Sequence, residues 1–342
     1  MSRLNLYIKT YLFRIFAAIG RYCELYLSPP SPQRPSFTVR IPSTIGSVPG
    51  SFKLLFYTPP SYKLGQQSSK KYPVLVNFHG GAYSVGNAAD DARWATTVLQ
   101  KIECVIVSVD YRLAPRYPFP TGIEDCVSAM LYLWANADSL HLDVSRTALS
   151  GFSAGGNYSF TAPIRLHQEI ARLKAEDRLA EVELGKLVGI VAFYPAVDWT
   201  RSRAERAASN PNTKPIGMPK SLVGVFDESY LYPKPADMRN PLLSPALADE
   251  ALLKEALPRK VCFITCWGDA LLGEGEAFRE RLRGMGSVIS GFTVPGVAHG
   301  WDKMPSWGNM TRERDEAYRV AVESLKDMYS PLMNYKDLLF GE

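Results

Sequence analysis

Short apolar runs alternate with stretches of helical character along most of the chain, and this alternation is what most constrains the fold. Strands separated by helices of this length predict a parallel sheet that is covered on both faces. We therefore expect an α/β fold, with a mostly parallel central sheet flanked by helices. The runs expected to form its buried strands are Pro73–Phe78, Val105–Val109, Thr147–Ser150, Leu187–Phe193, Val261–Cys266 and Gly291–Val294.

One long segment interrupts the alternation. Residues 199–239 hold five prolines and carry seven basic against four acidic side chains. A connection of this length inside a compact domain is usually a lid or a binding element. We therefore expect a cap insertion that is helical around Ser221–Tyr230, with a plain loop as the alternative. The core is then expected to comprise residues 51–198 and 240–342.

The first 28 residues are apolar, but four basic residues interrupt them. Their longest charge-free run is far below the roughly 20 residues that a membrane span needs. On a helical wheel, one side carries Arg3, Thr10, Arg14 and Arg21, and the opposite side carries Ile8, Leu12, Ile15 and Ile19. This pattern predicts an amphipathic helix, which could dock on the protein body or lie on a membrane surface.

Composition narrows the classes of partner. The chain has 342 residues and a net charge of +5, with 39 basic and 34 acidic residues. It contains no block of like charges, so nucleic acid is not the expected partner. Its five cysteines form no CxxC pair, and we expect free thiols in a cytoplasmic protein, or in one held on an intracellular membrane. No metal site and no cofactor are expected, because no His, Cys and carboxylate cluster has ligand spacing.

The pentapeptide Gly151-Phe152-Ser153-Ala154-Gly155 follows a strand-like run and precedes a helical stretch. Glycines in a G-x-S-x-G sequence allow a sharp turn from strand to helix, which leaves the serine hydroxyl exposed. A serine in this position is a candidate nucleophile. Ser153 is therefore predicted to attack the substrate.

A serine nucleophile needs a general base. The chain has four histidines. His167 lies about four helical turns beyond Ser153, out of reach of its hydroxyl, and His141 lies in a turn before the strand Thr147–Ser150. His79 ends a strand in a glycine-rich turn. His299 follows the last expected strand and precedes the helix expected at Glu313–Met328, so we predict that it is the base.

The acid that orients the base is expected between these two residues. Asp269 is the first carboxylate after the strand Val261–Cys266. Its predicted task is to hold the imidazole tautomer and to stabilise the imidazolium. Glu274 is the alternative, although a carboxylate at the start of a helix also has an ordinary explanation in the helix dipole.

The oxyanion that forms during acyl transfer needs N–H donors already in place. The sequence His79-Gly80-Gly81-Ala82 follows the strand Pro73–Phe78, and its glycines let the backbone approach a substrate closely. We predict an oxyanion hole from the N–H groups of Gly80, Gly81 and Ala154. His79 is predicted to support this turn, and Ala82 could add a further donor.

Taken together, these motifs resemble those of the hormone-sensitive lipase type of α/β-hydrolases, which includes carboxylesterases and arylacetamide deacetylases. The resemblance implies the triad Ser153, Asp269 and His299, and a helical cap made from residues 1–50 and 199–239. The matching stretches, in order, are HGGAY at 79–83, DYRLAPRYPFP at 110–120, SGFSAGGN at 150–157, RNPLLSPALAD at 239–249, GDALLGEGEAF at 268–278 and VAHGWDK at 297–303.

Some positions depart from the family. Ala82 stands where the family usually has a third glycine, and its methyl group is expected to narrow the alcohol side of the site. Ala82 and Tyr83 are both expected to contact the substrate. Ala270 and Gly273 replace a proline and a second aspartate, which we interpret as loop variation. The first 50 residues match no family motif.

The predicted activity is hydrolysis of a carboxylic ester of a small or medium-sized hydrophobic substrate through an acyl-Ser153 intermediate. Acyl transfer, lactone formation or deacetylation would use the same residues. A non-catalytic receptor, like the plant gibberellin receptors that lack the histidine, is the least expected because His299 is present. A homodimer is left open. In the family the N-terminal segment caps the pocket, which would place Leu12, Ile15 and Ile19 at the acyl-binding wall.

Overall fold

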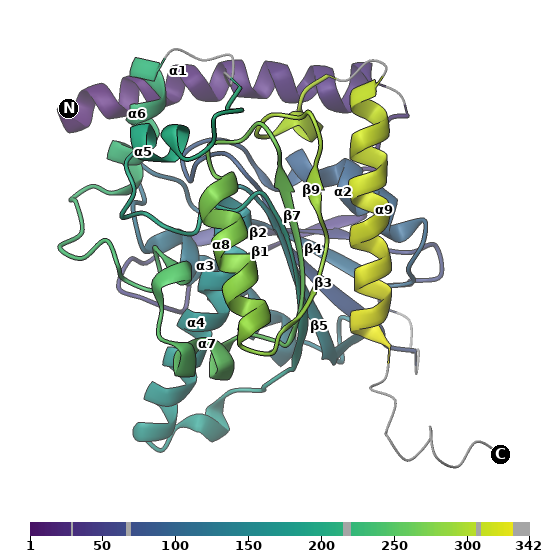
Figure 1. The fold of residues 1–342 in the computed structure, drawn as a ribbon. Helices are drawn as coiled ribbons and strands as arrows, with labels where there is room; N and C mark the ends of the chain where they lie inside the picture. The colour runs from purple at the N-terminus through teal and green to yellow at the C-terminus, as the bar shows by residue number, and fades with distance from the viewer. Residues whose placement is uncertain (29, 66–69, 215–219, 306–308, 331–342) are drawn as a thin grey trace.

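The protein is built around a single twisted sheet (Figure 1). The computed structural model describes residues 1–28, 30–65, 70–214, 220–305 and 309–330. Within these ranges the strand order is β1-β2-β4-β3-β5-β6-β7-β8, and β9 pairs with β7. Their bounds are β1 Phe37–Pro42, β2 Ser51–Tyr57, β3 Tyr72–Phe78, β4 Val105–Asp110, β5 Leu142–Phe152, β6 Leu187–Phe193, β7 Lys260–Cys266, β8 Val288–Ser290 and β9 Thr293–Val294.

The pairing from β3 through β9 is parallel, whereas β1 pairs with β2, and β2 with β4, in antiparallel fashion. Parallel strands are buried on both faces and need helical connections. The structure thus confirms the α/β fold with a mostly parallel sheet. The sheet begins within the segment 1–50 that was assigned to the cap, because β1 is its edge strand.

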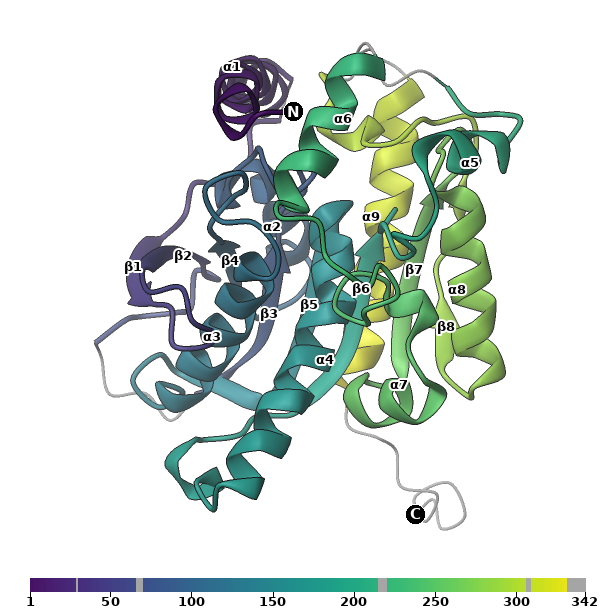
Figure 2. The ribbon, with the colours of Figure 1, turned by 90° about the vertical axis from the view of Figure 1, so that its left-hand side faces the viewer.

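Helices cover both faces of this sheet (Figures 1 and 2). Two core clusters result, and residues of a strand alternate between them: Val74 and Val76 belong to one cluster and Leu75 to the other. This period of two follows from the pleat of a strand. The helices are α1 Arg3–Tyr22, α2 Ala92–Leu99, α3 Thr121–Ala135, α4 Ala154–Ala175, α5 Arg203–Ala208, α6 Lys220–Tyr230, α7 Glu250–Ala256, α8 Leu272–Gly284 and α9 Asn309–Tyr329.

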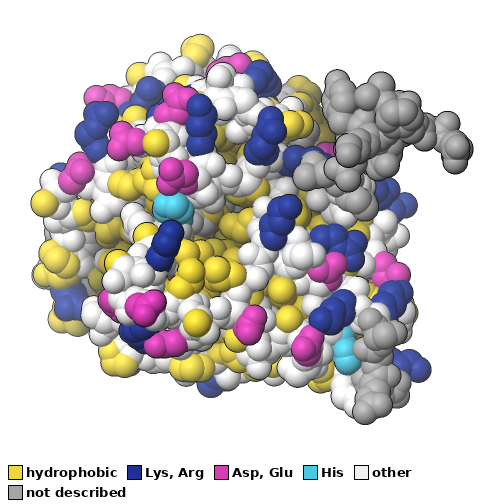
Figure 3. Space-filling model, turned by 90° about the horizontal axis from the view of Figure 1, so that it is seen from below, with side chains coloured by type: hydrophobic (Ala, Val, Ile, Leu, Met, Phe, Trp, Pro, Cys, Tyr) yellow, Lys and Arg dark blue, Asp and Glu magenta, His cyan; other side chains and the backbone are white. Residues whose placement is uncertain are grey.

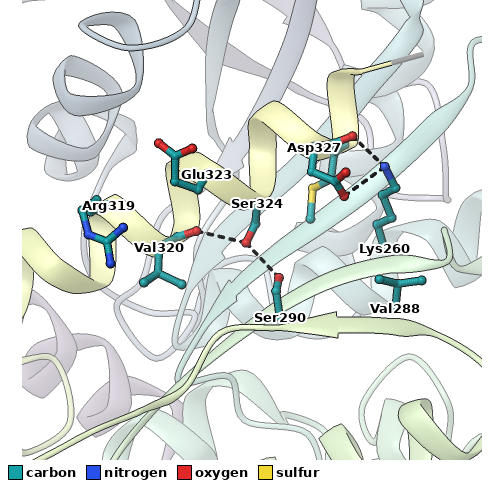
Figure 4. Close-up of a pocket in the computed structure, with 9 residues that line it drawn as sticks. Lys260, Val288, Ser290, Arg319, Val320, Glu323, Ser324 and Asp327 are labelled. Carbon is teal, nitrogen blue, oxygen red and sulfur yellow. Dashed lines mark hydrogen bonds and ion pairs between the residues drawn. The ribbon is translucent and has the colours of Figure 1, made fainter. Parts of the chain in front are cut away.

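The last strands of the sheet differ from the prediction. The predicted strand Gly291–Val294 is only the two-residue β9, and the sequence pattern missed β8 before it. A hollow of about 330 Å³ lies between β8 and α9, where Lys260 forms an ion pair with Asp327 at 3.0 Å (Figure 4). Because Lys260 starts β7 and Asp269 follows its far end, this hollow is remote from the predicted catalytic residues.

Helix α1 and the insertion lie together across the carboxyl ends of the parallel strands (Figures 1 and 2). The ring centroids of Phe13 and Phe226 are 5.0 Å apart, and the hydroxyls of Thr10 and Ser229 are 3.2 Å apart. Helix α6 begins at Lys220, close to the predicted Ser221, whereas the sequence pattern missed α5. The two segments assigned to a cap are therefore in contact with each other.

The orientation of α1 corrects one prediction. Leu12, Ile15 and Ile19 are 52%, 48% and 57% exposed, so they face outward instead of lining an acyl-binding wall. The opposite, polar side of the helix docks, because Arg14 donates hydrogen bonds to backbone carbonyls and Arg21 pairs with Asp90. A helical wheel defines two faces, but it does not say which one finds partners in the folded body.

Candidate active site

The predicted nucleophile lies in a strained turn between β5 and α4. Ser153 has φ 53° and ψ −111°, a conformation that few residues with a side chain adopt. The glycines around it are required by close approach: a Cβ on Gly151 would lie 2.1 Å from the Gly155 carbonyl oxygen, and one on Gly155 would lie 1.9 Å from that of Phe78. The turn is held by a 2.9 Å hydrogen bond from the Ser153 N–H to the carbonyl of Phe193.

Ser153, His299 and Asp269 form a continuous hydrogen-bonded chain. The hydroxyl oxygen of Ser153 lies 2.8 Å from Nε2 of His299, and Nδ1 of His299 lies 2.7 Å from Oδ2 of Asp269. The other carboxylate oxygen of Asp269 accepts the N–H of Leu271 at 3.0 Å. This geometry suits a serine that gives its proton to an imidazole oriented by a buried carboxylate.

Electrostatics at His299 favour its charged form. Burial alone would lower its pKa, but the negative charges of Asp269 and, more weakly, Asp302 raise the pKa above its ordinary value. The carboxylate of Asp269 is buried, so its charge is poorly screened. An imidazolium formed during proton transfer would therefore be stabilised in place.

Glu274, the alternative acid, has other partners. Its Oε1 accepts the N–H groups of Val197 and Asp198 at 2.8 and 3.2 Å, and its Oε2 pairs with Arg206 at 2.7 Å. The side chain is buried, and burial raises its pKa despite the charge of Arg206. These contacts hold the start of the insertion, so the structure assigns Glu274 a structural position away from His299.

The loop after β3 carries the predicted oxyanion donors. Gly81 has φ 123°, and a Cβ there would lie 2.1 Å from the carbonyl oxygen of Val85, so only glycine fits. The carbonyl of Gly81 accepts the N–H groups of Ser84 and Val85 at 3.0 and 2.9 Å. A Cβ on Gly80 would lie 3.0 Å from the carbonyl oxygen of Phe152, which places this loop directly against the turn that ends at Ala154.

His79 lies behind this loop, away from solvent. Its ring stacks on that of Tyr111 at a centroid distance of 4.2 Å, and its Nδ1 lies 2.7 Å from the carbonyl oxygen of Gly80. The hydroxyl of Tyr111 donates to the His79 carbonyl at 2.7 Å. These contacts tie the His79 ring and the Tyr111 hydroxyl to the backbone of this turn.

The two residues expected to contact substrate differ in their placement. Ala82 has φ 47° and is half-buried in the loop after β3. Tyr83 is only 3% exposed, and its ring stacks on that of Tyr230 at 3.8 Å and tilts against Trp199 at 5.6 Å. Tyr83 therefore packs against the insertion, and its burial leaves it little surface for the substrate contact that was expected of it.

A buried polar network behind His299 was missed by the sequence reasoning. The ring of Tyr194 packs edge-on against His299 at 4.9 Å, and its hydroxyl donates to Asp302. Asp302 also accepts from Tyr318 at 2.8 Å and pairs with Lys303 at 3.3 Å. The only available signal was the DK pair after His299 in VAHGWDK, which has no meaning without the fold.

The described ranges of the chain contain no group of three or more His, Cys, Asp or Glu side chains that could hold a metal ion. The same ranges contain no helix with the length and apolar character to cross a bilayer.

Arg112, in the motif Tyr111–Pro115, makes a buried pair with Asp125 at 2.8 Å and bonds to the carbonyls of Val48 and Pro49. Arg112 thus holds the segment that precedes β2, and Tyr111 of the same motif bonds to the turn after β3.

The chain matches known proteins over most of this architecture. A family described as having the alpha/beta hydrolase fold matches residues 75–303. The chain is 31% identical over 211 residues to an AB hydrolase superfamily protein of Schizosaccharomyces pombe, a match that covers 62% of this chain and 58% of that protein. It is 44% identical over 233 residues to carboxylesterase NlhH of Mycobacterium tuberculosis, covering 67% and 66%.

Solved structures agree with the sequence matches. The thermostable carboxylesterase EstE1 from a metagenomic library superposes with a TM-score of 0.71 at 25% identity, over 94% of this chain and 98% of that one. The matched stretch spans less than two thirds of each of the two sequence relatives. The family match includes Ser153, Asp269 and His299, and the chain therefore belongs to the α/β-hydrolase family, in its hormone-sensitive lipase-like, carboxylesterase type.

Proposed function

We propose that this protein is a serine hydrolase that cleaves a carboxylic ester of a small or medium-sized hydrophobic substrate. The observation that carries the proposal is the chain of hydrogen bonds from Asp269 through His299 to Ser153, at 2.7 and 2.8 Å. The family supports it, since the relatives reported above include carboxylesterases.

In the first half-reaction, Ser153 Oγ bonds to the ester carbonyl carbon while its proton passes to Nε2 of His299. The negative charge on the carbonyl oxygen is held by the N–H groups of Gly80, Gly81 and Ala154. The tetrahedral intermediate then collapses, and the leaving alkoxide takes the proton from His299. This step leaves the acyl group on Ser153 and releases an alcohol.

In the second half-reaction, a water molecule gives a proton to His299 and attacks the acyl-Ser153 carbonyl carbon. The intermediate collapses, the Ser153 oxygen recovers the proton, and the carboxylic acid leaves. Asp269 keeps the Nδ1 proton on His299 throughout, so that Nε2 faces the serine.

A hydrophobic substrate is supported by the residues that border the loop after Gly81. Tyr83, Trp199 and Tyr230 are all buried and pack together where the insertion meets this loop: Tyr83 stacks on Tyr230, and Trp199 is tilted against both rings. Apolar walls with few polar groups are typical of small-molecule sites.

Acyl transfer or lactone formation remains the second candidate, because a hydroxyl could replace water in the second half-reaction. Deacetylation of an amide would use the same residues. Incubation of an activated ester with added alcohols separates these possibilities: a new ester indicates transfer, and the free acid indicates hydrolysis. A receptor role predicts ligand binding without turnover.

The proposal extends to location and assembly. All five cysteines are free and four are buried, which supports a cytoplasmic setting. Contact with an intracellular membrane through residues 1–28 is part of the proposal, and a homodimer is a further candidate assembly.

The test is a panel of p-nitrophenyl esters of increasing acyl length, with an acetylated aryl amide beside them. We expect turnover of short and medium esters by the wild type, and loss of essentially all of it in Ser153→Ala with the fold retained. Retention of most turnover by this variant would overturn the proposed mechanism.

A further inference from the structure

The outward face of α1 is an apolar ridge without a partner inside the chain. Leu4 and Phe16 are 69% and 71% exposed, and every large side chain on that side of the helix is more than 45% exposed. The spacing follows the turns of the helix, so the side chains form one continuous stripe. Its members are Leu4, Ile8, Tyr11, Leu12, Ile15, Phe16, Ile19 and Tyr22.

The inner face of α1 is held firmly, so the ridge is not a loosely docked helix. Arg14 donates to the carbonyls of Ser84 and Ala114, both at 2.9 Å. Arg21 pairs with the buried Asp90 at 3.2 Å. Turning the helix over to bury its apolar side would break these bonds and leave Asp90 without this cation, which is costly for a buried charge.

Helix α1 also carries charge of one sign only. The helix contains four basic residues and no acidic one. Arg14 and Arg21 face inward, whereas Arg3 is exposed and Lys9 lies at the edge of the ridge. On the opposite side of the molecule, charges of both signs are interspersed (Figure 3).

We infer that this ridge docks flat on an anionic lipid surface. Helices that lie at the headgroup–acyl boundary carry apolar and aromatic side chains on one face and basic residues beside it. Helix α1 has such a face, with Lys9 at its edge. Helix α1 crosses the carboxyl ends of the parallel strands (Figures 1 and 2), so docking would turn that edge, which carries Ser153, toward the lipid. The inference deepens the membrane-contact part of the proposed function and does not depend on the chemistry of Ser153.

A second copy of the chain fits this ridge less well. A 20-residue helix is about 30 Å long and its exposed stripe is roughly 10 Å wide, a footprint of about 300 Å². A stable dimer buries about 800 Å² on each partner. Pairing two such ridges would also bring two cationic helices together with no carboxylate from either helix between them.

The experiment is co-sedimentation of the full-length protein with vesicles of phosphatidylcholine alone and with about 30% phosphatidylglycerol. Wild type is expected to sediment with the anionic vesicles and much less with the neutral ones. The double variant Leu12→Glu, Phe16→Glu should lose at least about tenfold in partitioning, since it places two charges in the docking face. Val288→Glu is the matched control, because Val288 is 54% exposed on β8, away from α1.

Hydrolysis of a soluble acetate ester, measured on each variant, separates loss of docking from loss of folding or chemistry. Equal sedimentation of wild type and the double variant would overturn the inference. So would a failure of the wild type to bind either vesicle. A dimer in light scattering that the double variant abolishes, without vesicle binding, would assign the ridge to a second copy and would also overturn it.

Discussion

The turns at the carboxyl ends of β3 and β5 and the helix α1 lie at the same edge of the sheet, yet they differ in what determines them. The turns need glycine at fixed positions, because a Cβ on Gly81 or Gly155 would collide with backbone about 2 Å away. The orientation of α1 depends on distant partners, such as the carbonyl of Ala114 and the carboxylate of Asp90. A turn that requires glycine can therefore be predicted from the sequence, whereas the face of a helix that docks on the protein body cannot.

This difference also changes what α1 contributes. Its apolar residues face outward, so the choice of acyl length is not expected to reside in Leu12, Ile15 or Ile19.

The largest expected difference in activity is between substitutions of the two candidate acids, Asp269 and Glu274. Asp269→Asn should lower kcat by about 10⁴, because the amide favours the wrong imidazole tautomer. Glu274→Gln should keep kcat within about tenfold and lower stability instead, since it leaves the buried Arg206 without its charged partner. Steady-state kinetics and thermal unfolding of both proteins measure the contrast, and reversed effects would make Glu274 the acid.

The next contrast is between two glycines with positive φ. Gly81→Ala should lower kcat by about 10²–10³, the usual effect of losing an oxyanion donor, because the new methyl group must displace the carbonyl of Val85. Gly286→Ala is the control, since Gly286 has φ 92° but open space around it. It should cost stability only. Equal activity of the two variants would show that the Gly81 loop does not position the donors.

Asp302→Asn tests the network behind His299. The general base must be neutral, and Asp302 helps to raise the pKa of His299. Activity therefore falls as the pH drops through this raised pKa, and removing the charge should move that acid limb of kcat/KM to lower pH. Asp138→Asn, a change at an exposed carboxylate, should leave the limb in place. A limb that stays fixed or moves upward in Asp302→Asn would contradict this role.

The smallest effects distinguish the two faces of α1. Arg14→Met removes hydrogen bonds to two carbonyls and should reduce the free energy of unfolding by about 1–3 kcal/mol. Ile15→Gln, at a 48% exposed position, should change it by less than about 0.5 kcal/mol. Urea unfolding compares them, and a larger loss from Ile15→Gln would mean that the apolar face is the docked one.

The sequence was sufficient for the parallel sheet, since buried strands read as apolar runs, and for the order of Ser153, Asp269 and His299 along the chain. It was insufficient where long-range contacts decide. Asp302 joins the network behind His299 only because the fold brings Tyr194, which follows β6, beside it. Glu274 is distinguished from Asp269 only by its partners in the folded protein, the N–H of Val197 and the guanidinium of Arg206. Neither set of contacts has a local pattern.

The most direct test of the proposed catalytic centre is to map the site of a fluorophosphonate adduct by mass spectrometry. The proposal predicts a single stoichiometric adduct on Ser153, formed far more slowly in His299→Ala because the serine then lacks its base. An adduct on another residue, or unchanged esterase activity in protein fully labelled at Ser153, would contradict it.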